Sequence, residues 1–370
     1  AGTVELCSMG RGIDADYRVT RRTRARPVAS QSVPTAISEL TTIRVGGPAR
    51  EFCVATTGEE LVSLVGEADR SGTDVLIVGG GSNLVVGDDG FDGRVIQVSS
   101  SRLEIDGEIV TVDAGVEWDS VVQATIEAGL SGMEALSGIP GTTGATPIQN
   151  VGAYGASTSE LLHSLTVYDR QTKETSVWTP EQCGFGTHRS SVFKRSSRYA
   201  ILEVSFALKK TTRSLPVRYA ALSERLDVQI GDVVPVQDVR AAVLALRGER
   251  GMVLDEGDHD TWSVGSFFLN PVLPEVPEQA AHAPSFPDPA GTKIPAAWLI
   301  QNSGFPRGYG TEFGRGTAAL SSKHVLAVTN RGGAMASDIM ALATHVRDGV
   351  QEKFGITLTP ECDLVNCALG

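Results

Sequence analysis

Nineteen successive residues, 137–155, contain no acidic or basic side chain and include five glycines. A surface loop of that length is ordinarily polar or charged, whereas small uncharged residues let backbone approach a partner closely. The stretch also carries Gln149, Asn150 and Tyr154. These features suit a wall against a large planar ligand with amide-like edges, such as a flavin. An ordered loop that lines an interface is the alternative interpretation.

A second small-residue stretch lies between two apolar runs, 75–78 and 84–86. Successive small residues allow backbone N–H groups to converge on an anion, which indicates a phosphate-binding loop. No Lys-Ser or Lys-Thr pair closes the loop, so it is not a P-loop. An apolar strand follows it instead of a helix, so it is not a Rossmann fingerprint. A simple hairpin loop is an equally good reading of this stretch by itself.

The chain has 370 residues and a formal net charge of −12. The length predicts two or three domains. The charge argues against a general nucleic-acid binder, although a few cations in a cleft could still bind an anionic substrate. No segment has the apolar length of a membrane span. The five cysteines form no CxxC motif, which favours reduced thiols and a cytoplasmic location.

Helix and strand signals alternate from Ser38 onward and predict an α+β or α/β fold. Thr57 and Glu60 form a capping pair for a helix that ends at Gly72. Further helices are expected at 117–128, at 237–247 and over 339–350. Strands are expected at 75–78, 84–86, 94–115 with a hairpin turn at 106–107, 164–178, 200–208, 262–270 and 356–359. Residues 271–289, which include six prolines, are expected to be irregular.

Eight stretches in order along the chain resemble the UDP-N-acetylenolpyruvoylglucosamine reductases, flavoenzymes of bacterial peptidoglycan precursor synthesis. The resemblance covers about 35–369 and rests on the motifs at 41–49, 79–84, 138–155, 185–194, 265–271, 297–300, 320–324 and 360–361. It implies an α+β architecture. Two subdomains form an FAD-binding fold of the vanillyl-alcohol-oxidase (PCMH) type, and a third α+β domain binds substrate.

The resemblance also implies a division of the chain. Residues 1–34 are expected to be a disordered or extended leader, 35–98 and 99–215 the two FAD-binding subdomains, and 216–352 the substrate-binding domain. The last segment, 353–370, is expected to return to the active-site cleft. A monomer is expected, without nucleic-acid binding or membrane insertion.

The reaction implied by the family uses FAD and NADPH. NADPH reduces FAD, and the enolpyruvyl ether of a UDP-sugar then enters the same cleft. A hydride passes from flavin N5 to the vinyl carbon, and a proton goes to the adjacent carbon. Arg189 is the matching cation for the substrate carboxylate, Ser266 the matching proton donor, and Glu361 the group that stabilises or protonates the intermediate.

Ligand-binding residues carry over in the same way. The cofactor-binding candidates are Gly79, Gly80, Gly81, Ser82, Asn83, Leu84, Pro140, Gly141, Thr142, Gly144, Ala145, Gln149, Asn150, Gly152, Ala153 and Tyr154. The substrate-binding candidates are Tyr219, Arg250, Asn270 and Asn302.

Three features depart from the family or compete with it. His188 stands before Arg189 where a tyrosine is usual, and Asp363 stands where some members carry a base. The aspartates and the histidine at 255–260 could bind a metal, but their spacing fits a polar loop better, and no metal is predicted. The rival functions are a flavin oxidase of the same fold and a non-catalytic flavin- or nucleotide-sugar-binding regulator.

Overall fold

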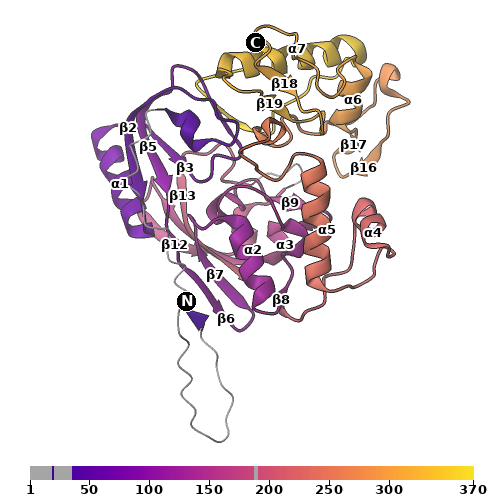
Figure 1. Ribbon diagram of the computed structural model, residues 1–370. Helices are drawn as coiled ribbons and strands as arrows, with labels where there is room; N and C mark the ends of the chain where they lie inside the picture. Colours follow the sequence, from indigo (N-terminus) through magenta and orange to yellow (C-terminus); the bar gives the residue numbers. More distant parts are fainter. Residues whose placement is uncertain (1–18, 21–35, 187–190) are drawn as a thin grey trace, which may run out of the picture.

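The computed structural model describes residues 19–20, 36–186 and 191–370. Figure 1 shows a larger body built on two sheets and, above it, a C-terminal unit dominated by helix α7. Most of the predicted leader, 1–34, lies outside the described residues. Its residues 19 and 20 form strand β1 (Val19–Thr20) at the edge of a sheet.

A three-stranded parallel sheet follows the N-terminal segment. Its strand order is β2-β5-β3, with bounds Ala49–Ala55, Phe91–Val98 and Val75–Val78. Helix α1 (Gly58–Ser71) connects β2 to β3 and buries Leu61, Val65 and Ala68. The short strand β4 (Leu84–Val86) lies outside this sheet and pairs in parallel with β20 (Asp363–Val365). This pairing joins the C-terminal segment to the strand that follows the first small-residue loop.

The second sheet is antiparallel and has six strands in the order β1-β6-β7-β13-β11-β12. After β1, the bounds are Leu103–Asp106, Ile109–Asp113, Tyr199–Ala207, Leu162–Asp169 and Glu174–Trp178. Helix α2 (Trp118–Glu127) covers one face, where the fully buried Trp118 ring meets Phe206 edge-on. Smaller pieces complete this part: α3 (Thr158–Leu161) and the pairs β8 (Leu130–Ser131) with β14 (Lys209–Lys210), and β9 (Gly152–Ala153) with β10 (Ala156–Ser157).

Helices α4 (Ala220–Leu226) and α5 (Val236–Glu249) lie beside this sheet body rather than with the C-terminal unit (Figure 1). They share a small core with Val217 and Tyr154. Val236 at the start of α5 packs into the core of the six-stranded sheet. The predicted division at 215/216 is thus crossed by apolar packing, and the domain bounds stay a prediction.

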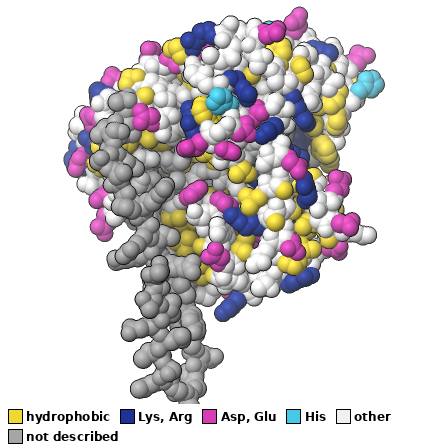
Figure 2. Space-filling view, in the orientation of Figure 1, with side chains coloured by type: hydrophobic (Ala, Val, Ile, Leu, Met, Phe, Trp, Pro, Cys, Tyr) yellow, Lys and Arg dark blue, Asp and Glu magenta, His cyan; other side chains and the backbone are white. Residues whose placement is uncertain are grey.

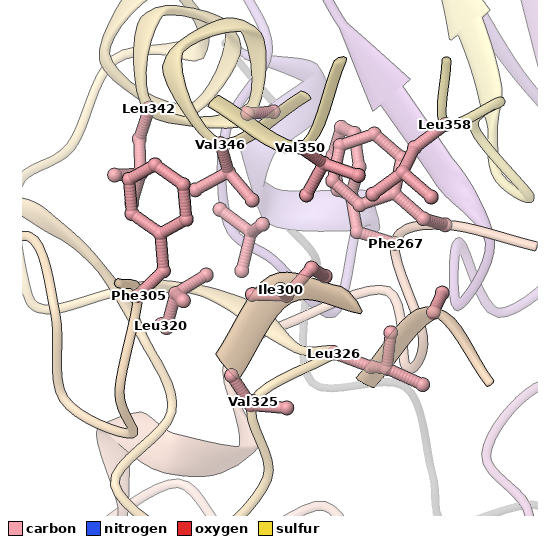
Figure 3. Close-up of a cluster of buried hydrophobic side chains, with 14 of the residues drawn as sticks. Phe267, Ile300, Phe305, Leu320, Val325, Leu326, Leu342, Val346, Val350 and Leu358 are labelled. Atoms are coloured by element: carbon pink, nitrogen blue, oxygen red, sulfur yellow. The ribbon is translucent and has the colours of Figure 1, made fainter. Parts of the chain in front are cut away.

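The C-terminal unit packs around α7 (Ala336–Phe354). Figure 3 shows Val346 and Val350 of α7 facing Ile300 of α6 (Ala296–Asn302), with Phe267 and Leu358 alongside. The strands of this unit are β15 (Val272–Leu273), β16 (Phe286–Asp288), β17 (Gly291–Lys293), β18 (Ala318–Leu320) and β19 (Val328–Asn330). Single 3-10 turns in the described chain occupy Ile37–Leu40, Glu134–Leu136, Thr143–Ala145, Pro180–Cys183, His259–Thr261 and Glu278–Ala280.

Local signals placed the long helices correctly. The Thr57 side chain accepts a hydrogen bond from the Glu60 amide, and Gly72 ends α1 with φ 68°. The Glu60 carboxylate accepts from the Thr56 amide and hydroxyl, one residue earlier than a standard capping box. Gly355 ends α7, also at φ 68°. The predicted hairpin at 106–107 joins β6 and β7.

Two predicted strands are wrong. Residues 262–270 form no strand, because Gly265 turns the backbone at φ 73° and the following amide groups bond to different segments. Residues 356–359 form no strand either; the strand begins at Asp363. The proline-rich segment 271–289, expected to be irregular, contributes β15 and β16 to a three-stranded sheet with β17.

The glycines of the first loop have no room for side chains. A Cβ on Gly79 would lie 2.2 Å from the Thr142 hydroxyl, and one on Gly80 would lie 2.7 Å from the Gly141 Cα. A Cβ on Gly81 would lie 2.0 Å from the Leu40 carbonyl oxygen. The two small-residue stretches therefore dock backbone against backbone.

Replacing Gly81 by alanine tests this packing. Gly81 and Gly107 have nearly the same φ, 58° and 60°, but no heavy atom lies within 4 Å of a Cβ at Gly107. Gly107→Ala should lower the free energy of unfolding by about 1 kcal/mol, the cost of left-handed backbone. Gly81→Ala adds a backbone clash and should lower it by roughly 2–4 kcal/mol. Urea unfolding of both variants measures the difference, and equal losses would contradict the docking of the loop.

Candidate functional site

A cavity of about 900 Å³ lies where the two small-residue stretches meet the C-terminal segment. Most of its wall comes from four parts of the chain, within 75–84, 139–151, 193–201 and 357–369, and Val98, Ala114, Arg170 and Arg347 add to it. The predicted cofactor-binding residues that line it are Gly79, Gly80, Gly81, Ser82, Asn83, Leu84, Pro140, Thr142, Gly144, Ala145 and Gln149. Residues far apart in sequence thus share one hollow of a size suited to a large organic ligand.

The other predicted cofactor-binding residues lie outside this wall. Gly141 packs behind it, where an added Cβ would lie 2.6 Å from the Ser82 hydroxyl. Asn150 accepts a hydrogen bond from the Ser159 amide at 2.9 Å. Gly152 and Ala153 form β9. The Tyr154 ring meets Tyr219 edge-on at 5.5 Å, and burial raises the Tyr154 pKa.

The loop after β3 has the chemistry of an anion site. Among the described residues, the amides of Gly80, Gly81 and Ser82 donate to no protein acceptor, and all three residues line the cavity. The Gly81 carbonyl, by contrast, accepts from the Thr42 amide at 3.2 Å and points away from them. Adjacent amides that face a hollow can bind the oxygens of a pyrophosphate. The loop therefore fits the diphosphate of a dinucleotide cofactor.

A polar network crosses the cavity wall. The Gln149 carbonyl oxygen accepts from the Asn83 amide nitrogen at 2.6 Å and from Lys194 Nζ at 3.3 Å. Lys194 Nζ also donates to the Glu361 main-chain oxygen at 2.9 Å and to the Asp363 carboxylate at 3.2 Å. Gln149 is one of the predicted cofactor-binding residues. Asp363 stands where some members of the family carry a base. Lys194 belongs to the predicted motif 185–194, but its role becomes visible only through these tertiary contacts.

Two of the three catalytic candidates are brought together. The Glu361 amide donates to the Phe267 carbonyl at 2.8 Å, so Glu361 lies beside the residue that follows Ser266. Ser266 is half-buried, and Glu361 is 8% exposed. Pro360 and Cys362, on either side of Glu361, line the cavity. Arg189 and its neighbour His188 lie outside the described residues.

The end of the Arg189 motif is nevertheless placed. The Ser191 hydroxyl donates to the main-chain oxygen of Ile148, a cavity-lining residue. Phe193 is buried beside Trp178 and Tyr199. This segment therefore runs along the second small-residue stretch and reaches Glu361 through Lys194.

Cys362 is the other reactive group beside Glu361. Burial raises the pKa of its thiol to about 12, so the thiol stays protonated and is a poor nucleophile. Cys53, Cys183, Cys362 and Cys367 are all free thiols. Nucleophilic thiol chemistry at Cys362 is thus not favoured.

The four substrate candidates fall into two groups. Tyr219 contacts Tyr154. Arg250 lies at the C-terminal end of α5. Burial raises the pKa of Tyr154, and the positive charge of Arg250 acts on it in the opposite direction with a smaller effect. Asn270 and Asn302 lie at opposite ends of α6. The Asn270 side chain accepts from the Ala296 amide at 2.9 Å, and the Asn302 side chain donates to the Trp298 carbonyl at 2.8 Å. These two hydrogen bonds stabilise the ends of α6.

The acidic loop at 255–260 bonds to protein groups. Asp258 contacts Lys323 at 2.5 Å, and Asp260 contacts Arg331 at 2.8 Å and the Ser322 amide at 2.9 Å. The described residues contain no group of three or more potential ligands that could hold a metal ion. Figure 2 shows acidic and basic side chains interspersed over the visible face. In the part of the chain that is described, no helix combines the length and apolar character needed to cross a membrane.

Comparison with known proteins agrees with this geometry. Residues 49–176 match the family described as FAD binding domain, and 257–365 match the C-terminal domain of UDP-N-acetylenolpyruvoylglucosamine reductase. The chain is 49% identical over 358 residues to the UDP-N-acetylenolpyruvoylglucosamine reductase of Thermobifida fusca, covering 92% of this chain and 99% of the relative. It is 50% identical to the Nocardia farcinica protein of the same name over 337 residues, covering 88% and 87%.

A solved structure extends the comparison to the fold. The UDP-N-acetylenolpyruvylglucosamine reductase of Thermus caldophilus is 25% identical, with a TM-score of 0.62, covering 89% of this chain and 97% of that one. The predicted α+β fold, with an FAD-binding unit of the vanillyl-alcohol-oxidase type, is confirmed. The chain belongs to the UDP-N-acetylenolpyruvoylglucosamine reductase family.

Proposed function

We propose that the protein reduces the enolpyruvyl double bond of UDP-N-acetylglucosamine enolpyruvate to give UDP-N-acetylmuramate, with FAD as cofactor and NADPH as reductant. The observation that carries the proposal is the pairing of Glu361 with Phe267 at the edge of the large cavity. This pairing supports the proposal because it holds Glu361 beside the residue that follows Ser266, and because Pro360 and Cys362, on either side of Glu361, line the cavity. Family membership supplies the substrate class.

The residues that would hold FAD are on both small-residue stretches. The amides of residues 80–82 would bind the diphosphate, and the uncharged stretch from Pro140 to Gln149 would face the flat ring system. FAD, when bound, supplies the hydride for the double bond. The protein itself must orient the enolpyruvyl group, stabilise the charge that develops on its carboxylate and deliver a proton to carbon.

Ser266 is the proposed proton donor. A serine hydroxyl is protonated at neutral pH, and a carbanion next to a carboxylate is basic enough to take that proton. Arg189 is the proposed cation for the substrate carboxylate, because a guanidinium can bind both carboxylate oxygens. Glu361 is proposed to stabilise or protonate the same intermediate. Its burial and the buried Phe267 and Phe268 beside Ser266 would keep water away from this step.

A second group of residues supports a nucleotide-sugar substrate. His324 is strongly buried, and its pKa is lowered to about 4 by that burial and by the charges of Arg250 and Arg307. These three residues come from the end of α5 and two loops of the C-terminal unit. The guanidinium groups of Arg250 and Arg307, whose charges act on His324, are donors of the kind that bind phosphate oxygens. We assign the UDP moiety to this region.

One experiment distinguishes the proposed reductase from a flavin oxidase and from a non-catalytic binding protein. The purified protein should be yellow, lose its colour anaerobically with NADPH, and regain it at once when the enolpyruvyl UDP-sugar is added. Recovery of colour only with oxygen would indicate a flavin oxidase. A yellow protein without any response to NADPH would indicate a binding protein. A monomer in the cytoplasm is part of the proposal, and sedimentation of the purified protein tests the first half of it.

Ser266→Ala should separate the two halves of the reaction. Bleaching by NADPH should continue at the normal rate, because Ser266 acts on the second substrate. Recovery of colour with the enolpyruvyl UDP-sugar should slow by roughly 10²–10⁴-fold, the usual contribution of a positioned acid. Stopped-flow absorbance measures both steps. The matched control is Ser205→Ala, which removes a buried hydroxyl in the six-stranded sheet; a similar slowing in both variants would sink the assignment.

His324 should make stability depend on pH. Its folded pKa of about 4 lies below the usual 6.5, so the unfolded chain binds the proton more readily between these values. Above pH 6.5, His324 is mostly neutral in both the folded and the unfolded chain, and its contribution to stability is fully present. As the pH falls toward 4, the free energy of unfolding decreases by up to about 3 kcal/mol. His324→Gln should flatten this part of the stability curve. Urea unfolding across that range compares the two proteins, and parallel curves would refute the interpretation.

A further inference from the structure

We infer that Lys194 and Asp363 form a charge pair that holds Glu361 in place and sets the reduction potential of the bound flavin. The inference rests on the proposed function and deepens it. Lys194 is here a positioning residue, because it bonds to the wall of the site and to the backbone of a catalytic candidate. Asp363 supplies the charge that balances it.

The first support is the set of bonds that Lys194 makes. Its ammonium group reaches acceptors on two separate segments: the Gln149 carbonyl oxygen, the Glu361 main-chain oxygen and the Asp363 carboxylate. An ammonium group has three protons, and three acceptors satisfy them. Lys194 therefore ties the C-terminal segment to the second small-residue stretch at the residue that carries the Glu361 side chain.

The second support is the orientation of Gln149. Both Asn83 Nδ2 and Lys194 Nζ donate to its side-chain oxygen. The amide nitrogen of Gln149 must then point the other way, and Gln149 lines the cavity. Lys194 thus determines that this wall presents a donor to the ligand and not an acceptor.

The third support is charge and burial. The side chains of Lys194 and Asp363 are 14% and 34% exposed, and Nζ lies 3.1 Å from the Asp363 Oδ1 atom. That oxygen is buried and accepts no geometrically defined hydrogen bond, so the ion pair is its contact. Buried charges interact far more strongly with their surroundings than exposed ones. As a pair the two largely cancel, but removing one leaves a net charge beside the cavity.

A net charge at this place has a predictable effect on a flavin. Reduction adds electrons, so a nearby cation favours the reduced form and a nearby anion disfavours it. Among the described residues, the cations that line the cavity are Arg170, Arg195 and Arg347, and they stay unchanged when the pair is altered. Arg170 is paired with Asp69, and Arg347 with Asp348. The pair can therefore be tested by removing its members one at a time.

The experiment measures the midpoint potential of the bound flavin by anaerobic reduction against a reference dye. Lys194→Met leaves the Asp363 anion and should lower the potential. Asp363→Asn leaves the Lys194 cation and should raise it. The double variant should lie closer to the unaltered protein than either single variant. The matched control is the exposed pair Arg50 and Asp92, 3.0 Å apart and 47% and 90% exposed; Arg50→Met and Asp92→Asn should leave the potential unchanged.

Shifts of the same sign in the two single variants, or shifts no larger than those of the control pair, would overturn the inference. Lys194→Met removes three hydrogen bonds and could release the flavin. Asp363→Asn then decides by itself, since it keeps the lysine bonds to Gln149 and Glu361, and a lowered or unchanged potential would again refute the pair. An unaltered protein that holds no flavin would instead refute the proposed function. The two failures can be told apart at the first purification, because a protein without flavin would be colourless.

Discussion

The backbone pairing of the C-terminal segment is the constraint on which the site depends. Three interactions fix it in succession: the Leu269 amide donates to Thr359, the Glu361 amide donates to Phe267, and β20 pairs with β4. Leu358, just before these bonds, and Cys362, between the second and the third, are 1% exposed and anchor the segment in the C-terminal core. Glu361 has little freedom left, because the residues on both sides of it are held by hydrogen bonds and burial. The main chain thus keeps the Glu361 carboxylate close to the segment that carries Ser266.

The cofactor cavity depends on a second, purely steric constraint. The first loop meets the second at Gly79 and Gly80 on one side and at Gly141 and Thr142 on the other, with no space for a Cβ at either glycine. The amides of residues 80–82 have no acceptor among the described residues, and all three residues line the cavity. The same absence of side chains that lets the loops dock therefore exposes the donors that an anion needs. Packing and binding are here two results of one sequence feature.

Local patterns predicted the parts of the fold that local interactions determine. Helices α1 and α7 were placed by their apolar spacing and by Gly72 and Gly355, and the structure confirms both ends. The stretches 262–270 and 356–359 were expected to be strands because they are apolar. Their hydrogen bonds go to residues far away in sequence, such as Leu326 for Phe267. No local pattern reports such partners, and Gly265 interrupts the backbone in a way that apolar spacing does not reveal.

In the candidate site, too, sequence motifs predicted some features, and contacts between distant residues determine the others. Motif resemblance predicted the two cavity-lining loops and both Ser266 and Glu361, which tertiary contacts bring together. It did not assign a role to Lys194, because the acceptors of that lysine lie 45 to 169 residues away. Asn270 and Asn302 are predicted substrate contacts, and each also bonds to α6, so their role toward a ligand stays a prediction. A polar residue in a motif can serve the fold, and only its partners tell the two roles apart.

Helix α5 connects the substrate side to the flavin side. Arg240 binds both oxygens of Asp119 at 2.7 Å, and Asp119 also accepts from the Gly138 amide at 2.6 Å. Arg247 donates to the Gly138 carbonyl at 3.2 Å. Gly138 is the second residue of the uncharged stretch, so two arginines of α5 hold the start of that stretch, and Arg250 follows Arg247 one turn later. A phosphate bound by Arg250 would thus be held by the helix that also holds the flavin wall. Arg240 and Arg247 thus tie α5 to the flavin wall, and Glu249 at the end of α5 pairs with Arg225 of α4, so the helix joins the two sides whatever boundary is drawn between the domains.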